Sequence, residues 1–469
     1  MPAAGADCLR HAFVRFTDSW RIFCNNLFDS LLMDYKFFPH TDEEIKDMLK
    51  VSGVDSLDAL YAEVPEDIRF MGDYNLPGAM SEIEVRQFFE KLGKENKQLT
   101  CFAGAGVYDH YCPSMVSRIV QRSEFLTSYT PYQAEISQGT LHYIFEYQSM
   151  MAELTGMDIS NASMYDGTTA TAEAVMMAVA SAKKCDTVII SETVDKKILD
   201  VVKTYAHFHG IKIEMIAEKE GVTDKADFEQ KMAQGGVAGV VVQQPNRYGI
   251  VEDYAGFADT AHANKGLMIM NSVAADLAVL KTPAEWGADI AVGDGQSLGV
   301  PMQFGGPYVG YMCCREKLIR KMPGRIVGMT KDNRGQRAFV LTLQAREQHI
   351  RRQKATSNIC SNQSLMALFV TVYMAVMGKQ GVKEAAEMSY AGTHYMMDRL
   401  VETGKFKPTF SKPFFNEFCV DYDGDVDALQ QKFIDNGFMG GVKVGEHTIM
   451  FAVTEQRTKD EIDNLIKLI

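Results

Sequence analysis

The chain has 469 residues, 46% of them hydrophobic and 23% charged, which is typical of a folded globular protein with more than one domain. Its formal net charge of -13 argues against the cationic surface that non-specific nucleic-acid binding requires. We therefore expect no nucleic-acid partner. No apolar run reaches the roughly 18 residues of a membrane span, so we also expect no membrane association.

The nine cysteines are scattered and include no C-x-x-C pair. This pattern favours a reducing, cytoplasmic location without a disulfide framework. His207 and His209 have no carboxylate or thiol at ligand spacing, so we expect no metal site.

The N-terminal region divides at Met33, which begins a stretch that reads like a natural start. Residues 1–32 lack the apolar core and cleavage pattern of a signal peptide, and we interpret them as a non-native or disordered extension. Over residues 33–95, two capping-box patterns, which begin at Thr41 and Ser81, predict a helical arm.

The segment TSYTPYQAEISQG, residues 127–139, is dense in hydroxyl and amide side chains. Such a segment, bounded by Gly and Pro, is either a binding loop on a rigid frame or a polar turn that covers the core. The candidate contact residues are Tyr129, Thr130, Tyr132, Gln133, Glu135 and Gln138.

A turn at residues 166–169 then leads into an alanine-rich helix, whose N-terminus could bind an anion or could be an ordinary cap by Thr168 or Thr169. From there strand-like and helical runs alternate, which predicts a mostly parallel sheet covered by helices, with ligands beyond the carboxyl ends of the strands. The strand-like runs are 187–191, 212–216, 238–243, 267–270, 289–292 and 309–313. We expect a large α/β domain over 96–345 and a small α+β domain over 346–469.

The stretch from residue 267 to 310 contains a strand that ends in Asn271, a second strand, Gln296, and a Gly-Gly-Pro turn. In this order it resembles the cofactor-binding stretch of pyridoxal-phosphate (PLP) enzymes of fold type I, the aspartate aminotransferase type. In those enzymes an acid pairs with the pyridinium nitrogen and a lysine forms the Schiff base. The corresponding positions here are Asn271 and Gln296.

These two residues cannot supply that chemistry, because an amide is not an amine nucleophile and Asn271 carries no charge to hold the ring nitrogen protonated. We therefore expect no covalently bound PLP, no catalytic residue in this chain, and an ordinary helix cap at residues 166–169. An alternative register, in which Lys265 or Lys281 serves as the anchor, stays open.

A basic segment follows the Gly-Gly-Pro turn in a chain that is otherwise acidic. It is either a solvated face or a positive patch for an acidic partner. Its basic residues include Arg346, Arg351, Arg352 and Lys354.

Three motifs, TSYTPYQAEISQG, GDGQSLGVPMQFGGP and REQHIRRQKATSNICSNQ, together resemble the alpha subunits (subunit 1) of the two-subunit P-protein family of the glycine cleavage system, from about residue 33 to the C-terminus. The resemblance implies a glycine dehydrogenase (decarboxylating), an oxidoreductase that decarboxylates glycine and transfers the aminomethyl group to the lipoyl arm of H-protein. It also implies that a homologous beta subunit carries the lysine and PLP, and that two alpha and two beta subunits form a heterotetramer.

On that basis we expect the 129–139 loop to reach the cofactor site of the beta subunit, and the basic patch to face H-protein. Two alternatives remain: a structural or regulatory pseudo-enzyme subunit, and a self-sufficient PLP lyase or transaminase.

Overall fold

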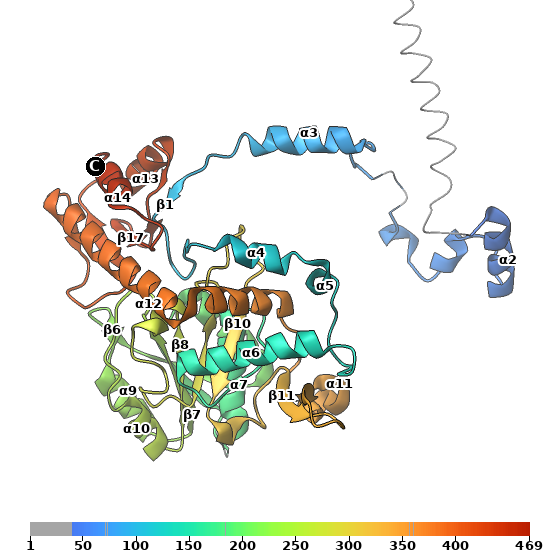
Figure 1. The fold of residues 1–469 in the computed structure, drawn as a ribbon, viewed down its shortest axis with the longest axis horizontal. Helices are drawn as coiled ribbons and strands as arrows, with labels where there is room; N and C mark the ends of the chain where they lie inside the picture. Colours follow the sequence, from blue (N-terminus) through green and yellow to red (C-terminus); the bar gives the residue numbers. More distant parts are fainter. Residues whose placement is uncertain (1–39, 71, 73, 183, 356, 360) are drawn as a thin grey trace, which may run out of the picture. The chain divides into compact units, whose positions relative to one another are not determined.

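A computed structural model of the protein describes residues 40–469, except 71, 73, 183, 356 and 360. The expected extension over 1–32 and the start at Met33 lie outside the described residues. The chain divides into two compact units, the first ending at Gly93 and the second running from Lys94 to Ile469, and each is considered by itself (Figure 1).

In its described residues the first unit contains the α-helices α2 (Asp42–Ser52) and α3 (Glu82–Gly93) and two short 3-10 helices, Asp58–Tyr61 and Glu66–Ile68. Both predicted capping boxes are confirmed. Thr41 and Glu44 exchange backbone and side-chain hydrogen bonds at the start of α2, and Ser81 and Glu84 do the same for α3. Neither helix buries a residue within the described chain. Local caps therefore define where these helices begin.

The second unit is built on a seven-stranded sheet with the order β2-β10-β9-β8-β7-β3-β4. Strands β4, β3, β7, β8 and β9 pair in parallel, and β10 runs antiparallel to β9 and β2, so the prediction of a mostly parallel sheet is confirmed. The strands are Ile159–Ser160 (β2), Thr187–Ser191 (β3), Lys212–Ile216 (β4), Val237–Gln244 (β7), Leu267–Ser272 (β8), Ile290–Asp294 (β9) and Gly310–Cys314 (β10).

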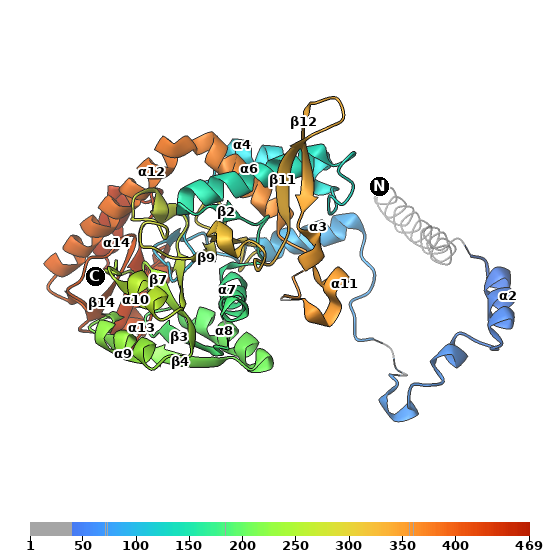
Figure 2. The ribbon, with the colours of Figure 1, turned by 90° about the horizontal axis from the view of Figure 1, so that it is seen from below.

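Both faces of this sheet are buried, as is typical of parallel sheets. Alternate residues of β7 divide between two hydrophobic clusters, with Val240 and Val242 in one and Val241 in the other. The first cluster includes α6 (Gln138–Thr155) and the first half of α12 (Ser364–Glu402). The second includes α7 (Gly167–Ser181) and α8 (Lys196–His209). Figure 2 shows α6 and α7 on opposite sides of the strands.

Helix α12 consists of two helical halves that meet at a kink, where Gly378 has a non-helical φ of 64°. By length and composition alone α12 could also cross a membrane, although Gly378 and Lys379 interrupt its apolar run. Its first half, however, contributes buried side chains such as Leu368, Val370 and Tyr373 to the core. The apolar character of this half is therefore explained by packing against the sheet and α6.

The region that follows β10 includes an element that the sequence analysis did not predict. It contains an antiparallel hairpin of β11 (Ile326–Lys331) and β12 (Arg337–Thr342). Phe339 of β12 is buried and packs against Phe145 of α6, which attaches the hairpin to the large sheet's helical layer.

The C-terminal part forms the expected α+β arrangement. A four-stranded antiparallel sheet has the order β13-β14-β17-β16, and a third apolar cluster lies between it and its helices. The elements are β13 (Phe406–Pro408), β14 (Glu417–Tyr422), α13 (Val426–Asp435), β16 (Val442–Lys443), β17 (Thr448–Ala452) and α14 (Lys459–Ile466).

Candidate functional site

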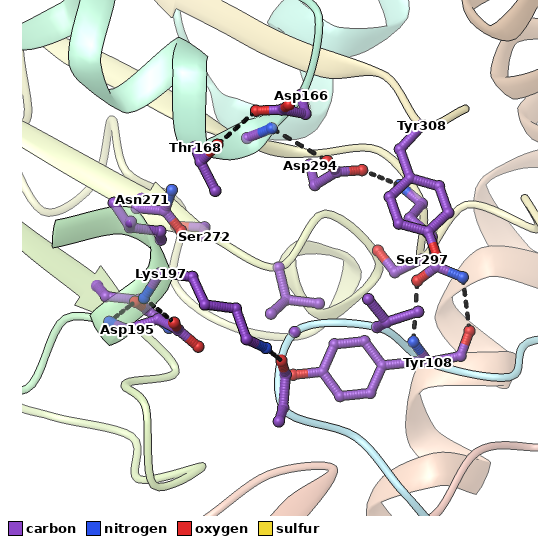
Figure 3. A pocket seen from close by; sticks show the side chains of 18 residues that line it. Tyr108, Asp166, Thr168, Asp195, Lys197, Asn271, Ser272, Asp294, Ser297 and Tyr308 are labelled. Atoms are coloured by element: carbon purple, nitrogen blue, oxygen red, sulfur yellow. Dashed lines mark hydrogen bonds between the residues drawn. The ribbon is translucent and has the colours of Figure 1, made fainter. Parts of the chain in front are cut away.

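A cavity of about 250 Å³ lies beyond the carboxyl ends of β3, β7, β8 and β9, where the predicted topology places a ligand (Figure 3). The loop over residues 105–108 closes one side, and the N-terminus of α7 closes another. Asn271 and Gln296 both line this cavity, so the structure brings together the two positions that the sequence singled out.

Gln296 is buried and its side-chain amide is fully hydrogen-bonded within the chain. Oε1 accepts from the backbone N–H of Tyr108 at 2.9 Å, while Nε2 donates to the carbonyls of Tyr108 and Val300, each at 2.7 Å. The Tyr108 hydroxyl in turn donates to the Glu417 carboxylate at 2.9 Å. Gln296 therefore fixes the loop that closes the cavity.

Asn271, at the place of the expected ring-nitrogen acid, donates from Nδ2 to the hydroxyl of Thr171 on α7 at 2.9 Å. It is 7% exposed, and its amide carries no charge. This side chain ties β8 to α7 and offers no counter-ion to a pyridinium.

The N-terminus of α7 is capped, but by Asp166 and not by the expected Thr168 or Thr169. The Asp166 carboxylate accepts from the backbone N–H of Thr169 at 2.8 Å and from the Thr168 hydroxyl at 2.7 Å. A second carboxylate, Asp294 at the end of β9, accepts from the backbone N–H of Gly167 at 3.0 Å. At the helix end that could have held a phosphate, the backbone N–H groups of Gly167 and Thr169 are thus taken by the chain's own carboxylates.

Asp294 is an unusual carboxyl group, because burial raises its pKa to about 6 despite hydrogen bonds from the backbone of Gly167 and Gln296. A phosphate placed beside Asp294 and Asp166 would meet like charges. Pyridoxal phosphate, which the fold type implies, therefore does not fit this cavity: its anchor, its ring counter-ion and its phosphate cup are all replaced.

Neither lysine of the alternative register lines the cavity. The Lys281 ammonium lies 3.8 Å from the centroid of the Trp286 ring, and Lys265 follows α10 (Phe257–Ala263) with a positive φ. Lys197, which was not among the predicted site residues, does line the cavity, and its Nζ donates to the carbonyl of Ala105 at 3.2 Å. The sequence signal that could have identified Lys197 was its place a few residues after the predicted strand 187–191.

Of the candidate loop residues, Tyr129, Tyr132, Gln133 and Glu135 are exposed and Thr130 is half-buried. The Tyr132 hydroxyl accepts from Arg325 at 3.2 Å, and its ring meets the His349 ring edge-on. Tyr129 is 87% exposed and makes no recorded hydrogen bond among the described residues.

Gln138 has a structural role, since it is the first residue of α6. Its amide donates to the carbonyls of Ala134 and Phe339 and accepts from the backbone N–H of Phe339. The segment before it is therefore fastened to β12 at one end.

The basic residues 346–354 do not form one uniform patch. Arg346 is half-buried, and its guanidinium donates to the carbonyls of Leu343, Met322 and Gly324, so it closes the turns on either side of the hairpin. Arg351, Arg352 and Lys354 are exposed. Of the four basic residues singled out from the sequence, these three are available to a partner.

A model of the family described as "Glycine cleavage system P-protein" matches residues 35–469. The chain belongs to this P-protein family. It is 47% identical over 444 residues to the "Probable glycine dehydrogenase (decarboxylating) subunit 1" of Anoxybacillus flavithermus, covering 93% of this chain and 98% of that relative. The protein of the same description from Geobacillus sp. is 48% identical over 444 residues, with the same coverage.

The P-protein family also accounts for the fold. A crystal structure of "glycine decarboxylase (P-protein) of the glycine cleavage system, in inhibitor-bound form" has a TM-score of 0.83 at 40% identity, covering 93% of this chain and 99% of that one. The Lactobacillus brevis glutamate decarboxylase has a TM-score of 0.64 at 13% identity, covering 86% and 95%. This second likeness shows the fold alone. The expected fold class, that of PLP-dependent enzymes of fold type I, is confirmed.

Proposed function

We propose that this chain is the subunit of a cytoplasmic glycine dehydrogenase (decarboxylating) that does not anchor PLP. A second, homologous subunit supplies the lysine and the cofactor, and the two form a heterotetramer of two copies each. The complex releases the carboxylate of glycine as carbon dioxide and passes the aminomethyl group to the lipoyl arm of H-protein. The names of the relatives as "subunit 1" support the existence of a partner subunit.

One observation carries the proposal: the side chain at the lysine position is a buried amide whose two ends are both hydrogen-bonded to Tyr108. Displacing the Gln296 side chain would leave the buried backbone N–H and carbonyl of Tyr108 without these hydrogen-bond partners. This arrangement supports a chain that does not anchor PLP and that contributes to catalysis through its surface.

That surface includes the exposed residues of the 129–135 segment. In the proposed complex, Tyr129, Thr130, Tyr132 and Gln133 orient the substrate or the lipoyl arm at the partner's cofactor site by hydrogen bonds. Tyr129 is the strongest candidate, because its hydroxyl has no recorded partner in the described part of this chain. The exposed Arg351, Arg352 and Lys354 face H-protein.

Reconstitution tests the proposal. Each subunit is purified separately, supplied with PLP, and assayed for glycine decarboxylation with lipoylated H-protein, alone and after mixing. We expect activity only on mixing. Full activity of the partner alone would reduce this chain to a structural or regulatory subunit, and activity of this chain alone would identify a self-sufficient enzyme.

A further inference from the structure

Arg325, the residue before β11, is the most buried arginine or lysine of the described residues, with 4% of its surface exposed. A buried charge is costly unless a group of opposite charge pairs with it. In the described part of the chain, however, the guanidinium bonds to two neutral groups: Nη1 donates to Asn362 Oδ1 at 3.3 Å, and Nη2 donates to the Tyr132 hydroxyl at 3.2 Å. Nε is buried without a hydrogen-bond partner. Stability alone does not explain an arginine in these surroundings.

Asn362 holds one side of this guanidinium in place. Its Nδ2 donates to the hydroxyl of Ser163 at 2.9 Å and to the carbonyl of Ala162 at 3.3 Å, so that Oδ1 is left to accept from Arg325. The backbone carbonyl of Arg325 also accepts from the N–H of Ala162 at 2.8 Å. The guanidinium is therefore fixed by buried parts of the fold, and its Nη2 is presented to Tyr132.

Tyr132 is the residue of the 129–135 segment that Arg325 supports. The Arg325 Cζ lies 5.4 Å from the centroid of the Tyr132 ring, and the ring of His349 meets the same ring edge-on at 6.4 Å. The carboxylate of Glu347 lies 3.4 Å from His349 Nδ1 and forms no ion pair with Arg325 within the described residues. These contacts hold the Tyr132 ring from one side, while 49% of the residue stays exposed.

The hydrogen bond from Arg325 determines what the Tyr132 hydroxyl can do. A guanidinium has donors and no acceptor, so the phenolic oxygen accepts and keeps its own proton for another group. No residue of the described chain is recorded as accepting that proton. A hydroxyl that is polarised by a neighbouring cation donates most strongly to an acceptor with a negative charge.

The proposed reaction brings two groups to this segment, and they differ in charge. Glycine carries a carboxylate, whereas the disulfide of the lipoyl arm is neutral. The uncompensated charge behind Tyr132 therefore favours glycine.

We propose that Arg325 is a positioning residue for glycine: it holds Tyr132 so that the phenolic hydroxyl donates to the glycine carboxylate at the partner's cofactor site. Arg325 acts through Tyr132, because its own guanidinium is buried. This inference rests on the proposed function, and it goes further by assigning Tyr132 to the amino-acid substrate and not to the lipoyl arm.

The first experiment tests the contact in the isolated full-length chain, where the proposed function plays no part. A 3-fluorotyrosine placed at Tyr132 reports the surroundings of the ring by ¹⁹F NMR. Arg325→Met keeps a long side chain but removes the charge and the donors, so the resonance should shift and narrow. The same label at Tyr111, which is 55% exposed, is the control and should not respond. An unchanged resonance at Tyr132 would overturn the inference.

The second experiment is a double-mutant cycle in the assembled complex, supplied with PLP and lipoylated H-protein. Tyr132→Phe and Arg325→Met should each raise the KM for glycine by about tenfold, the factor expected for one hydrogen bond to a charged group. The double variant should be no worse than Tyr132→Phe alone, and the KM for H-protein should not change. Arg325→Lys, which keeps a charge and a donor, should recover part of the loss.

Arg457→Met is the matched control, because the Arg457 side chain is only 9% exposed but pairs with Asp109. Any effect of this variant should multiply with that of Tyr132→Phe. If the effects of Arg325→Met and Tyr132→Phe also multiply, or if the KM for H-protein rises in place of that for glycine, the inference is overturned and the proposed function stands. Full activity of Tyr132→Phe would overturn the inference and remove Tyr132 from the proposed function. Absence of activity on mixing the unaltered subunits would defeat both.

Discussion

Gln296 and Tyr108 are joined by a pair of hydrogen bonds across 188 residues of sequence, with the amide of one side chain accepting from and donating to the backbone of the other residue. The pair closes the cavity at the carboxyl end of the sheet. In the resemblance that the sequence suggested, the same position carries the Schiff-base lysine. At the position where those enzymes carry the cofactor lysine, this chain has Gln296, which fixes the loop over residues 105–108.

Gln296→Lys should therefore fail to restore cofactor binding. Lysine cannot accept a hydrogen bond from Tyr108 N–H, and leaving that buried group unpaired costs about 1–3 kcal/mol. We expect a lower midpoint of urea unfolding and no Schiff-base absorbance when PLP is added. Gln230→Lys, at an exposed position of α9 (Lys225–Ala233), is the control and should unfold like the unaltered chain. A stable Gln296→Lys variant with a Schiff-base band would contradict this account of the cavity.

Tyr129→Ala should lower the glycine decarboxylation rate of the assembled complex by about tenfold, the effect of losing one positioning hydrogen bond, without changing the stability of this chain. The side chain is 87% exposed, so its removal leaves no void. Phe208→Ala, at an 80% exposed aromatic position on α8, serves as the matched control and should retain full activity. Equal activities of the two variants would remove the loop from the mechanism.

The exposed basic residues make a separate prediction about H-protein. Arg351→Glu with Lys354→Glu should raise the apparent KM for H-protein by about threefold at low ionic strength, and by less in high salt. Lys407→Glu with Lys432→Glu reverses two exposed charges elsewhere and should leave KM unchanged. The same shift in both variants would mean that only total charge matters.

Glu173 on α7 predicts a pH dependence of stability. It is 1% exposed, and burial raises its pKa from 4.5 to about 7 in the folded chain. Since the folded pKa lies above the unfolded value, the stabilisation is complete below about pH 4.5 and is lost as the pH rises through about 7.

Glu173→Gln removes this titration and should be more stable than the unaltered chain at about pH 8, by up to about 3 kcal/mol, with little difference at about pH 5. Urea unfolding at both pH values measures this difference in the free energy of unfolding. The exposed Glu229→Gln on α9 is the control. A difference that is the same at both pH values would show that Glu173 is not protonated in the folded state.

Two glycines make opposite predictions about packing. A Cβ at Gly310 would lie 2.3 Å from the backbone carbonyl oxygen of Asp166, so Gly310→Ala should destabilise the chain by about 1–3 kcal/mol or more. A Cβ at Gly139, within α6, meets nothing within 4 Å. Gly139→Ala should therefore stabilise by about 0.5–1 kcal/mol, and thermal unfolding of the pair checks both signs. A tolerated Gly310→Ala would contradict the close approach of β10 to the α7 cap.

Local signals in the sequence predicted local structure well. The capping boxes at Thr41 and Ser81 form as expected, and strands β3 and β4 begin and end at the predicted residues. In the caps, each side chain bonds to a residue a few positions away in the sequence. In the strands, the residues follow a regular hydrophobic pattern. The hairpin of β11 and β12 was not predicted, although Asp332 accepts hydrogen bonds from the backbone of Arg334 and Gln336 at its turn.

The site itself could be predicted only in part. Asn271 and Gln296 were identified by their order along the chain. Their partners were not, because Asp294 meets Gly167 across 127 residues and Gln296 meets Tyr108 across 188, separations that only the topology of the sheet brings together. The replacement of a phosphate by two carboxylates at α7 became visible only once these long-range contacts were known.

The central claim is that the complex works with a cofactor held by the other subunit. Borohydride reduction of the assembled complex with PLP, followed by mass spectrometry of its peptides, tests this directly, because reduction fixes the cofactor to whichever lysine holds it. The account predicts a pyridoxyl group on a lysine of the partner subunit and none on this chain. A pyridoxyl group on Lys197, Lys265 or Lys281 would contradict it and would make this chain a PLP enzyme in its own right.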